Sequence, residues 1–177
     1  MNPETNASLV IMGVAGCGKS SLGAALAQRL GFELIEGDDH HSPGNRDKMR
    51  QGTPLTDADR DGWLTTLAGL LAQHPGGAVL TCSALRRAYR ERLRAAAPGL
   101  RFVFLDLTPE LAQQRVSARS SHFFSSSLVD SQFATLESPV GEPGVLRVDA
   151  AAPLTQLVDE AVAWFHATAT PHNPEAV

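Results

Sequence analysis

Residues 13–20 read Gly13-Val-Ala-Gly16-Cys-Gly18-Lys19-Ser20, the most informative motif in the chain. It fits the pattern G-x-x-x-x-G-K-[ST]. The apolar run Ser8–Met12 precedes it, and a pattern with leucines four residues apart follows it as far as Gly31. An apolar strand, a glycine-rich turn and an amphipathic helix in this order predict a phosphate-binding loop.

The residue types in this loop suit an anion. Glycine lets backbone N–H groups turn inward around phosphate oxygens, and the helix that follows presents its N-terminus to negative charge. Lys19 would reach the β- and γ-phosphates, and the Ser20 hydroxyl would coordinate Mg²⁺. We therefore expect a nucleoside triphosphate with Mg²⁺, bound by Gly13, Ala15, Gly16, Cys17, Gly18, Lys19, Ser20 and Ser21.

Beyond the loop, short apolar runs alternate with helical patterns. Further strands are expected at 32–35, 77–82, 101–107 and 145–148, and helices at 57–74, 86–97, 109–119 and from about 153. This alternation predicts an α/β fold, a parallel sheet of about five strands with helices on both faces. The 177 residues are expected to form one domain with a frayed tail at 168–177, and the serine-rich segment 120–127 could be a lid.

Composition and charge exclude several classes of protein. The net charge of −4 offers no bulk attraction for nucleic acid, and no apolar run approaches the ~20 residues that span a bilayer. The N-terminus lacks the basic start of a secretory signal, and two cysteines make no disulfide framework, so we expect a reducing, cytoplasmic location. Residues 84–119 carry eight basic and three acidic side chains, which indicates either a local anionic ligand or a solvated helix face.

The loop does not identify the phosphoryl acceptor, because GTPases, ATPase motors and small-molecule kinases all share it. The length argues against a motor, no guanine-reading N-K-x-D is present, and Thr81-Cys82-Ser83 ends its strand without a Walker-B aspartate. A small kinase is favoured, with an acceptor-binding segment at about 38–63. Asp38 follows the second strand, where ligands bind in such sheets. It could orient or deprotonate an attacking hydroxyl, or hold Mg²⁺ through water.

A series of short motifs runs from about residue 9 to 165 in a fixed order and spacing. They are Met12–Ser20, Gly37-Asp-Asp with His41 and Asn45, Lys48-Met49, 52–57, Asp59-Arg60 with Trp63-Leu64, Cys82–Arg86 with Tyr89-Arg90, Arg115, Arg119, His122–Phe124, Ser131–Phe133 and Thr135–Pro139. With these motifs the chain resembles the gluconokinase family, P-loop kinases related in fold to shikimate and adenylate kinases. It departs from the family pattern at Glu36, where Asp is common, and at Ser121, where Gly usually stands.

The resemblance implies a nucleoside-monophosphate-kinase-like fold with a small lid at about 115–135, and transfer of a phosphoryl group from ATP to the 6-hydroxyl of D-gluconate. The resemblance also implies a possible homodimer. Another small-molecule kinase of the same fold (for shikimate, a nucleotide or a different sugar acid) and a non-catalytic nucleotide-binding module are the alternatives.

The expected catalytic residues are Lys19, Asp38, Arg115 and Arg119. Arg115 and Arg119 share one helical face, where they could close over the ATP phosphates or form a solvated basic face. For gluconate the candidates are Asp38, His41, Arg60 and Arg86, because a guanidinium suits the carboxylate and Asp or His suits the hydroxyls. Ser20 and Asp38 are the candidates for Mg²⁺.

Three expectations concern packing. Trp63 is expected in a helix core and not as a platform for a sugar. Lys48 is as well suited to pair with Asp47 or Asp57 as to bind a ligand. Arg90 and Arg94, which follow Arg86 at four-residue spacing, are expected at the surface.

Overall fold

The computed structural model describes residues 7–118 and 126–169. Its centre is one sheet of five parallel strands in the order β2-β3-β1-β4-β5. The strands are β1 (Leu9–Met12), β2 (Glu33–Glu36), β3 (Ala78–Thr81), β4 (Arg101–Asp106) and β5 (Val145–Asp149). The predicted α/β fold with a five-stranded parallel sheet is confirmed.

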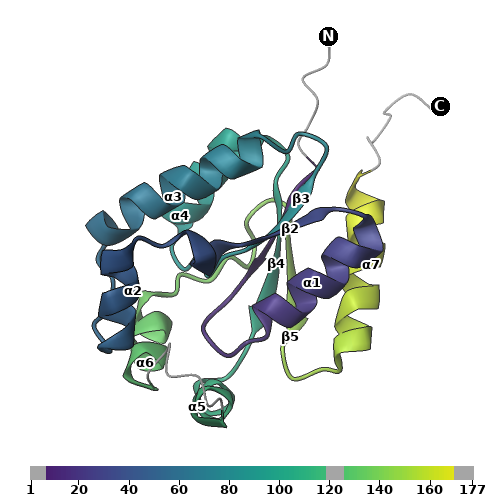
Figure 1. Cartoon of the computed structure of the whole chain (residues 1–177). Coiled ribbons are helices and arrows are strands. Elements are labelled where there is room, and N and C mark those ends of the chain that lie inside the picture. The colour runs from purple at the N-terminus through teal and green to yellow at the C-terminus, as the bar shows by residue number, and fades with distance from the viewer. Residues whose placement is uncertain (1–6, 119–125, 170–177) are drawn as a thin grey trace, which may run out of the picture.

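Helices cover both faces of the sheet, with α1 and α7 on one face and α3 and α4 on the other (Figure 1). The helices are α1 (Lys19–Leu30), α2 (Pro43–Arg50), α3 (Asp57–Ala72), α4 (Arg87–Ala96), α5 (Pro109–Ala118), α6 (Ser126–Thr135) and α7 (Leu154–Ala169). A short 3-10 helix, η1 (Gly37–His40), follows β2. None of the described helices has the length and apolar character needed to cross a membrane.

The central strand β1 holds the two faces together. All four of its residues are fully buried. Because side chains alternate along a strand, Leu9 and Ile11 join the apolar cluster under α1 and α7, whereas Val10 and Met12 join the cluster under α3 and α4. β1 pairs with β3 on one side and β4 on the other, so the phosphate loop begins at the carboxyl end of the most buried strand.

The helices α2 and α6 and the short helix η1 were not predicted. α2 has the signals of a helix start, since Ser42 accepts a hydrogen bond from the Asn45 N–H and Pro43 follows it, but its eight residues carry no apolar stripe. The expected lid segment 120–127 is only partly described: 119–125 lie outside the described residues, and Ser126 and Ser127 begin α6. Arg119 and the predicted tail beyond residue 169 also lie outside them.

The expectation that Arg90 and Arg94 lie at the surface is wrong. The Arg90 side chain is fully buried and that of Arg94 is 14% exposed, and both pair with Glu142 at 2.6 and 2.9 Å. Glu142 lies in the segment between α6 and β5, which covers α4. The physical reason is therefore a partner 52 positions away from Arg90, which helical spacing does not reveal.

Candidate active site

The phosphate loop joins β1 to α1 and curls around its own lysine. Lys19 Nζ donates to the carbonyl oxygens of Gly13 (3.0 Å) and Val14 (3.1 Å). A Cβ on Gly13, at φ +146°, would lie 2.8 Å from Cys17 Sγ and 2.9 Å from the Leu105 carbonyl. Gly18 precedes α1 at φ +97° and has no side chain that could cap the helix. The first N–H groups of α1 are therefore open to an anion.

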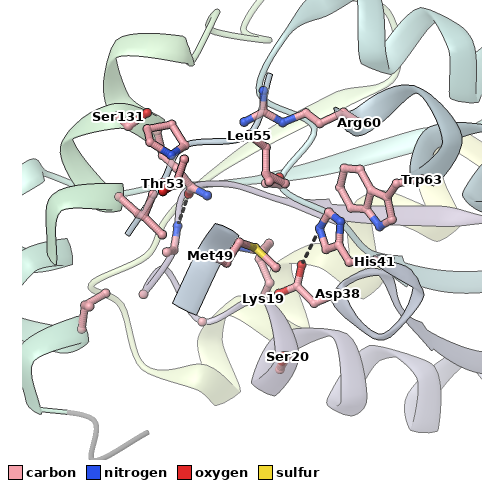
Figure 2. A pocket seen from close by; sticks show the side chains of 18 residues that line it. Lys19, Ser20, Asp38, His41, Met49, Thr53, Leu55, Arg60, Trp63 and Ser131 are labelled. Atoms are coloured by element: carbon pink, nitrogen blue, oxygen red, sulfur yellow. Dashed lines mark hydrogen bonds and ion pairs between the residues drawn. The ribbon is translucent and has the colours of Figure 1, made fainter. Parts of the chain in front are cut away.

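One pocket connects this loop with the segment that follows β2 (Figure 2). Eight of the predicted site residues line it: Ala15, Gly16, Gly18, Lys19, Ser20, Asp38, His41 and Arg60. In Figure 2, Lys19 and Ser20 lie at the base, while Asp38, His41 and Trp63 form one side and Ser131 from α6 lies on the opposite side. Gly13, Cys17, Ser21, Arg86 and Arg115 lie outside the lining.

Arg115 is held beneath the phosphate loop. Its guanidinium donates to the carbonyl oxygens of Gly16 (3.3 Å) and Cys17 (3.4 Å), and to that of Ala150 (3.0 Å). All three partners are neutral. The cation therefore adds positive charge to the loop, and its charge is not cancelled by a carboxylate in this set of bonds.

Ser20 is joined to a carboxylate that the sequence prediction did not include. Its hydroxyl donates to Glu36 Oε2 at 3.1 Å, and the Thr81 hydroxyl donates to the same oxygen at 2.6 Å. These are hard oxygen donors of the kind Mg²⁺ prefers. No group of three metal-binding side chains occurs within 7–118 and 126–169, but Mg²⁺ in kinases needs only one or two protein oxygens besides phosphate and water. Ser20, Glu36 and Asp38 thus fit the ion.

Asp38 faces His41, a buried histidine whose tautomer follows from its hydrogen-bond partners. Asn45 Nδ2 donates to the Asp59 carbonyl at 2.8 Å and lies 3.3 Å from His41 Nδ1. Because an amide nitrogen only donates, Nδ1 accepts, and the proton of the neutral ring is on Nε2, which lies 3.8 Å from Asp38 Oδ1. Burial lowers the pKa of His41 from 6.5 to about 4, although Asp38 opposes the shift. His41 is therefore neutral at pH 7.

Trp63 supports this histidine from behind. The indole ring stacks on the imidazole with centroids 4.2 Å apart, and its Nε1 donates to the Gly37 carbonyl at 2.8 Å. Trp63 is 5% exposed, which confirms the prediction that it belongs to the helix core. Through these two contacts Trp63 holds both η1 and the His41 ring in place, and it also lines the pocket.

Arg60 reaches the pocket from the first turn of α3. Its Nη1 donates to the Tyr89 hydroxyl at 3.2 Å, and that hydroxyl donates to Asp57. Burial, and then the hydrogen bond to Asp57, raise the pKa of Tyr89, so the partner of Arg60 is a neutral phenol. Arg86 lies on the other side of Asp57, 3.9 Å from its carboxylate, and is half-exposed.

Lys48 is an ion-pair residue and its partner is neither of those expected. Its Nζ lies 2.8 and 2.9 Å from the carboxylate oxygens of Asp59. The hydrogen bond from Lys48 and then that from the Thr56 N–H lower the pKa of Asp59 to about 2. Asp59 also completes the capping box of α3 with Thr56, so the pair ties α2 to the helix that carries Arg60.

Three comparisons place the chain among known proteins. A family model described as an AAA domain matches residues 9–143. The gluconokinase of Gluconobacter oxydans is 43% identical over 162 residues, which cover 90% of this chain and 91% of the relative. The crystal structure of a gluconokinase from Sinorhizobium meliloti 1021 matches with a TM-score of 0.85 at 46% identity, over 92% of this chain and 93% of that chain.

The chain belongs to the gluconokinase family. A deoxyadenosine kinase from M. mycoides, solved with bound dATP, has a TM-score of 0.64 at 14% identity over 90% of this chain and 99% of that chain. At that identity the likeness concerns the fold alone, and it agrees with the predicted nucleoside-monophosphate-kinase-like architecture.

No role was assigned from the sequence to two residues of this gluconokinase-family site, Glu36 and Gln132. Glu36 was noted only as a departure from the usual Asp, although its place at the end of β2 was a signal for a carboxylate beside the phosphate loop. Gln132 was quoted only within the motif Ser131–Phe133. It lines the pocket from α6, and its Oε1 accepts a hydrogen bond from the Ala15 N–H at 2.7 Å, a contact across 117 positions that no local pattern announces.

Proposed function

We propose that this protein transfers the γ-phosphoryl group of ATP to the 6-hydroxyl of D-gluconate, giving ADP and 6-phospho-D-gluconate, and that one P-loop kinase domain does so. The observation that carries the proposal is a pocket that joins Lys19 and Ser20 to Asp38, His41 and Arg60. The choice of D-gluconate as the acceptor rests on the gluconokinases to which the chain is similar.

Arg60 is the proposed partner of the gluconate carboxylate. Its guanidinium lines the pocket and is held by the neutral Tyr89 hydroxyl, and none of the ion pairs in the described part of the chain involves it. A guanidinium binds a carboxylate through two parallel hydrogen bonds, which also fixes the direction of the sugar chain. Arg86 is the second candidate and would first have to leave Asp57.

Asp38 is the proposed acceptor of the proton on the 6-hydroxyl. The bond from O6 to the γ-phosphorus forms while the bond to the bridging oxygen of ADP breaks, and the proton passes to the carboxylate. The neutral His41 keeps its Nε2–H toward Asp38 and contributes no positive charge that would weaken the carboxylate as a base. Asp38 and His41 both line the pocket and are also proposed to contact the sugar hydroxyls.

The positive charge on the nucleotide side comes from several groups. Lys19 is held by the carbonyl oxygens of Gly13 and Val14 and by a long contact to the Cys17 sulfur at 3.9 Å, with no carboxylate among these partners, so it can swing to the β- and γ-phosphates, while Arg115 supports the loop from beneath. Mg²⁺, when bound near Ser20, Glu36 and Asp38, neutralises charge on the phosphates. The role of Arg119 over ATP stays a prediction.

A cytoplasmic location and a homodimer also remain proposals. Cys17 and Cys82 are both free thiols, which suits a reducing compartment. Burial raises the pKa of Cys82 to about 12, so this thiol is unreactive at neutral pH.

The decisive experiment is coupled ADP release with Mg-ATP and D-gluconate, beside shikimate, AMP and a reaction without acceptor. We expect ADP release only when gluconate is the acceptor. In Lys19→Ala the rate of this ADP release should fall at least about 100-fold. Thermal melting of the variant checks that it is folded. ADP release with shikimate or AMP in place of gluconate would identify a different small-molecule kinase, and ATP binding without any ADP release would identify a nucleotide-binding module.

A further inference from the structure

The helix α6 presents Gln132 to the pocket from a firmly held position. Leu128 and Val129 of α6 are buried, and Asp130 accepts a hydrogen bond from Gln113 of α5 at 3.1 Å. The chain that leaves α6 is fixed by the Glu137 N–H, which donates to the Leu85 carbonyl at 2.7 Å. The helix that carries Gln132 is therefore held near both of its ends.

The contact with the phosphate loop orients the amide of Gln132. The Ala15 N–H can only donate, so the atom that meets it at 2.7 Å is the oxygen Oε1. The nitrogen Nε2 then lies on the other branch of the amide, in a side chain that lines the pocket. Among the described residues no hydrogen bond of Nε2 is found, so both of its N–H donors are open to a ligand.

Ala15 marks the end of the loop where the γ-phosphate arrives. Lys19, whose ammonium reaches the β- and γ-phosphates in such loops, rests on the carbonyl oxygens of the two residues just before Ala15. The Ala15 N–H itself is already used by Gln132. The Ala15 N–H is thus not available to a phosphate, but the two N–H groups of the Gln132 amide are placed beside the loop instead.

We propose that Gln132 is a catalytic residue that binds the transferred phosphoryl group: Oε1 is anchored on the Ala15 N–H, and Nε2 donates to an oxygen of the γ-phosphoryl group. The proposal rests on and deepens the proposed function, since it names a group that would bind the transferred phosphoryl group in the pocket that Asp38 also lines. Donors placed where charge develops stabilise the transition state of phosphoryl transfer.

Gln132→Glu tests this assignment because it changes the donor and keeps the anchor. The carboxylate still accepts from the Ala15 N–H, but it places a negative charge where Nε2 was. We expect kcat to fall about 100-fold with the gluconate KM within threefold. Affinity for a non-hydrolysable ATP analogue should fall about tenfold, whereas affinity for ADP, which lacks the γ-phosphate, stays within twofold.

Two further variants separate this role from a structural one. Gln132→Ala loses anchor and donor, and we expect kcat to fall about tenfold, less than in Gln132→Glu. Gln73→Glu, the same change at the exposed end of α3, should match the wild type. The proposal is overturned if Gln132→Ala is the worse variant, or if ADP and the analogue are affected equally. If Gln132→Glu does not fold, the ratio of analogue to ADP affinity in Gln132→Ala decides alone.

The nucleotide arm of this experiment does not require gluconate. If the wild type failed to phosphorylate gluconate, the proposed function would fail while the comparison of ADP with the analogue still decided the role of Gln132. If gluconate were phosphorylated and the analogue-to-ADP ratio did not change in either variant, the function would stand and the role of Gln132 would fall.

Discussion

Arg90 and Arg60 lie on the packed helices α4 and α3 and serve opposite purposes. Arg90 is fully buried, and its guanidinium donates to the carbonyl oxygens of Ala84 (2.7 Å) and Glu137 (3.0 Å) and to both carboxylate oxygens of Glu142. Arg60 faces the pocket and donates to one neutral hydroxyl. Arg90 uses four of its five N–H donors and is closed off from solvent, whereas Arg60 has most of its donors available.

The contrast between the two arginines helps to distinguish a structural cation from a ligand-binding one. In the Arg90 region the charge is cancelled in place: burial alone would raise the pKa of Glu142, but the hydrogen bonds from Arg90 and Arg94 outweigh it and hold that pKa below its ordinary value. Neutral partners are not a sufficient sign of a ligand site. Arg101 also donates only to neutral groups in the described part of the chain, yet it stacks on Phe165 at 3.8 Å and lies outside the pocket lining.

The largest effect is expected from Arg90→Met. It leaves Glu142 in a protein interior with only Arg94 as a partner, and removing one partner of a buried ion pair costs about 3–5 kcal/mol of unfolding free energy. Urea unfolding measures the loss, and Arg87→Met, at an exposed position on the same helix, is the control. The double variant Arg90→Met with Glu142→Leu should regain more than half of the loss. A loss below about 1 kcal/mol for Arg90→Met would show that the pair is not structural.

Arg60→Ala should act on the substrate and leave the fold intact. Loss of a charged hydrogen-bonding partner for a carboxylate costs about 2–3 kcal/mol, so kcat/KM for gluconate should fall about 30- to 150-fold, mainly through KM. The unfolding free energy should change by less than about 1 kcal/mol. Arg92→Ala, which removes an exposed ion pair with Asp61, is the matched control and should keep full activity. If Arg60→Ala kept its KM while Arg86→Ala lost it, the carboxylate would belong to Arg86.

His41 gives a smaller effect that depends on pH. The pKa is about 4 in the folded chain and 6.5 in the unfolded chain, so between these values the unfolded state binds more protons. The stability that a neutral His41 supplies is complete above pH 6.5 and is lost as pH falls toward 4, by about 2–3 kcal/mol at pH 4.5. Unfolding in urea at pH 7 and 4.5 should therefore show a weaker pH dependence in His41→Phe than in the wild type.

His74 provides the control of opposite sign. Hydrogen bonds to the Leu70 carbonyl and then to Glu33 raise its pKa above 6.5. Its stabilisation is therefore complete below pH 6.5 and is lost as pH rises through the raised value, so His74→Phe should lose more stability at pH 5 than at pH 8. The same direction in both variants would contradict the assignment of His41.

The sequence predicted the half of the site that is local in the chain. The loop from Gly13 to Ser20 is continuous, its residue types follow from phosphate chemistry, and the strand and helix around it carry clear apolar patterns. The same patterns predicted the five strands within one or two residues. Asp38 could be located because the carboxyl end of β2 lies beside the loop in any sheet of this type.

The residues that sequence reasoning missed depend on contacts between distant segments. The bond from Ala15 to Gln132 joins the loop to α6, and Arg90 pairs with a carboxylate beyond α6. Helical periodicity shows which face a residue occupies, but it does not show which segment covers that face. A buried arginine therefore has the same pattern as an exposed one until its partner is placed.

The smallest effect is expected where a carboxylate partner is present but burial is not. Arg147 Nε donates to Asp106 at 2.7 Å, as short as the bonds of Arg90, yet the two side chains are 54% and 38% exposed. Water competes for both charges, so Arg147→Ala should cost less than about 0.5 kcal/mol in urea, and less still at high salt. A cost near that of Arg90→Met would mean that hydrogen-bond length, not burial, makes an arginine structural. The expected gap of at least about sixfold in free energy, between ion pairs of similar length, assigns most of the difference to exclusion of solvent.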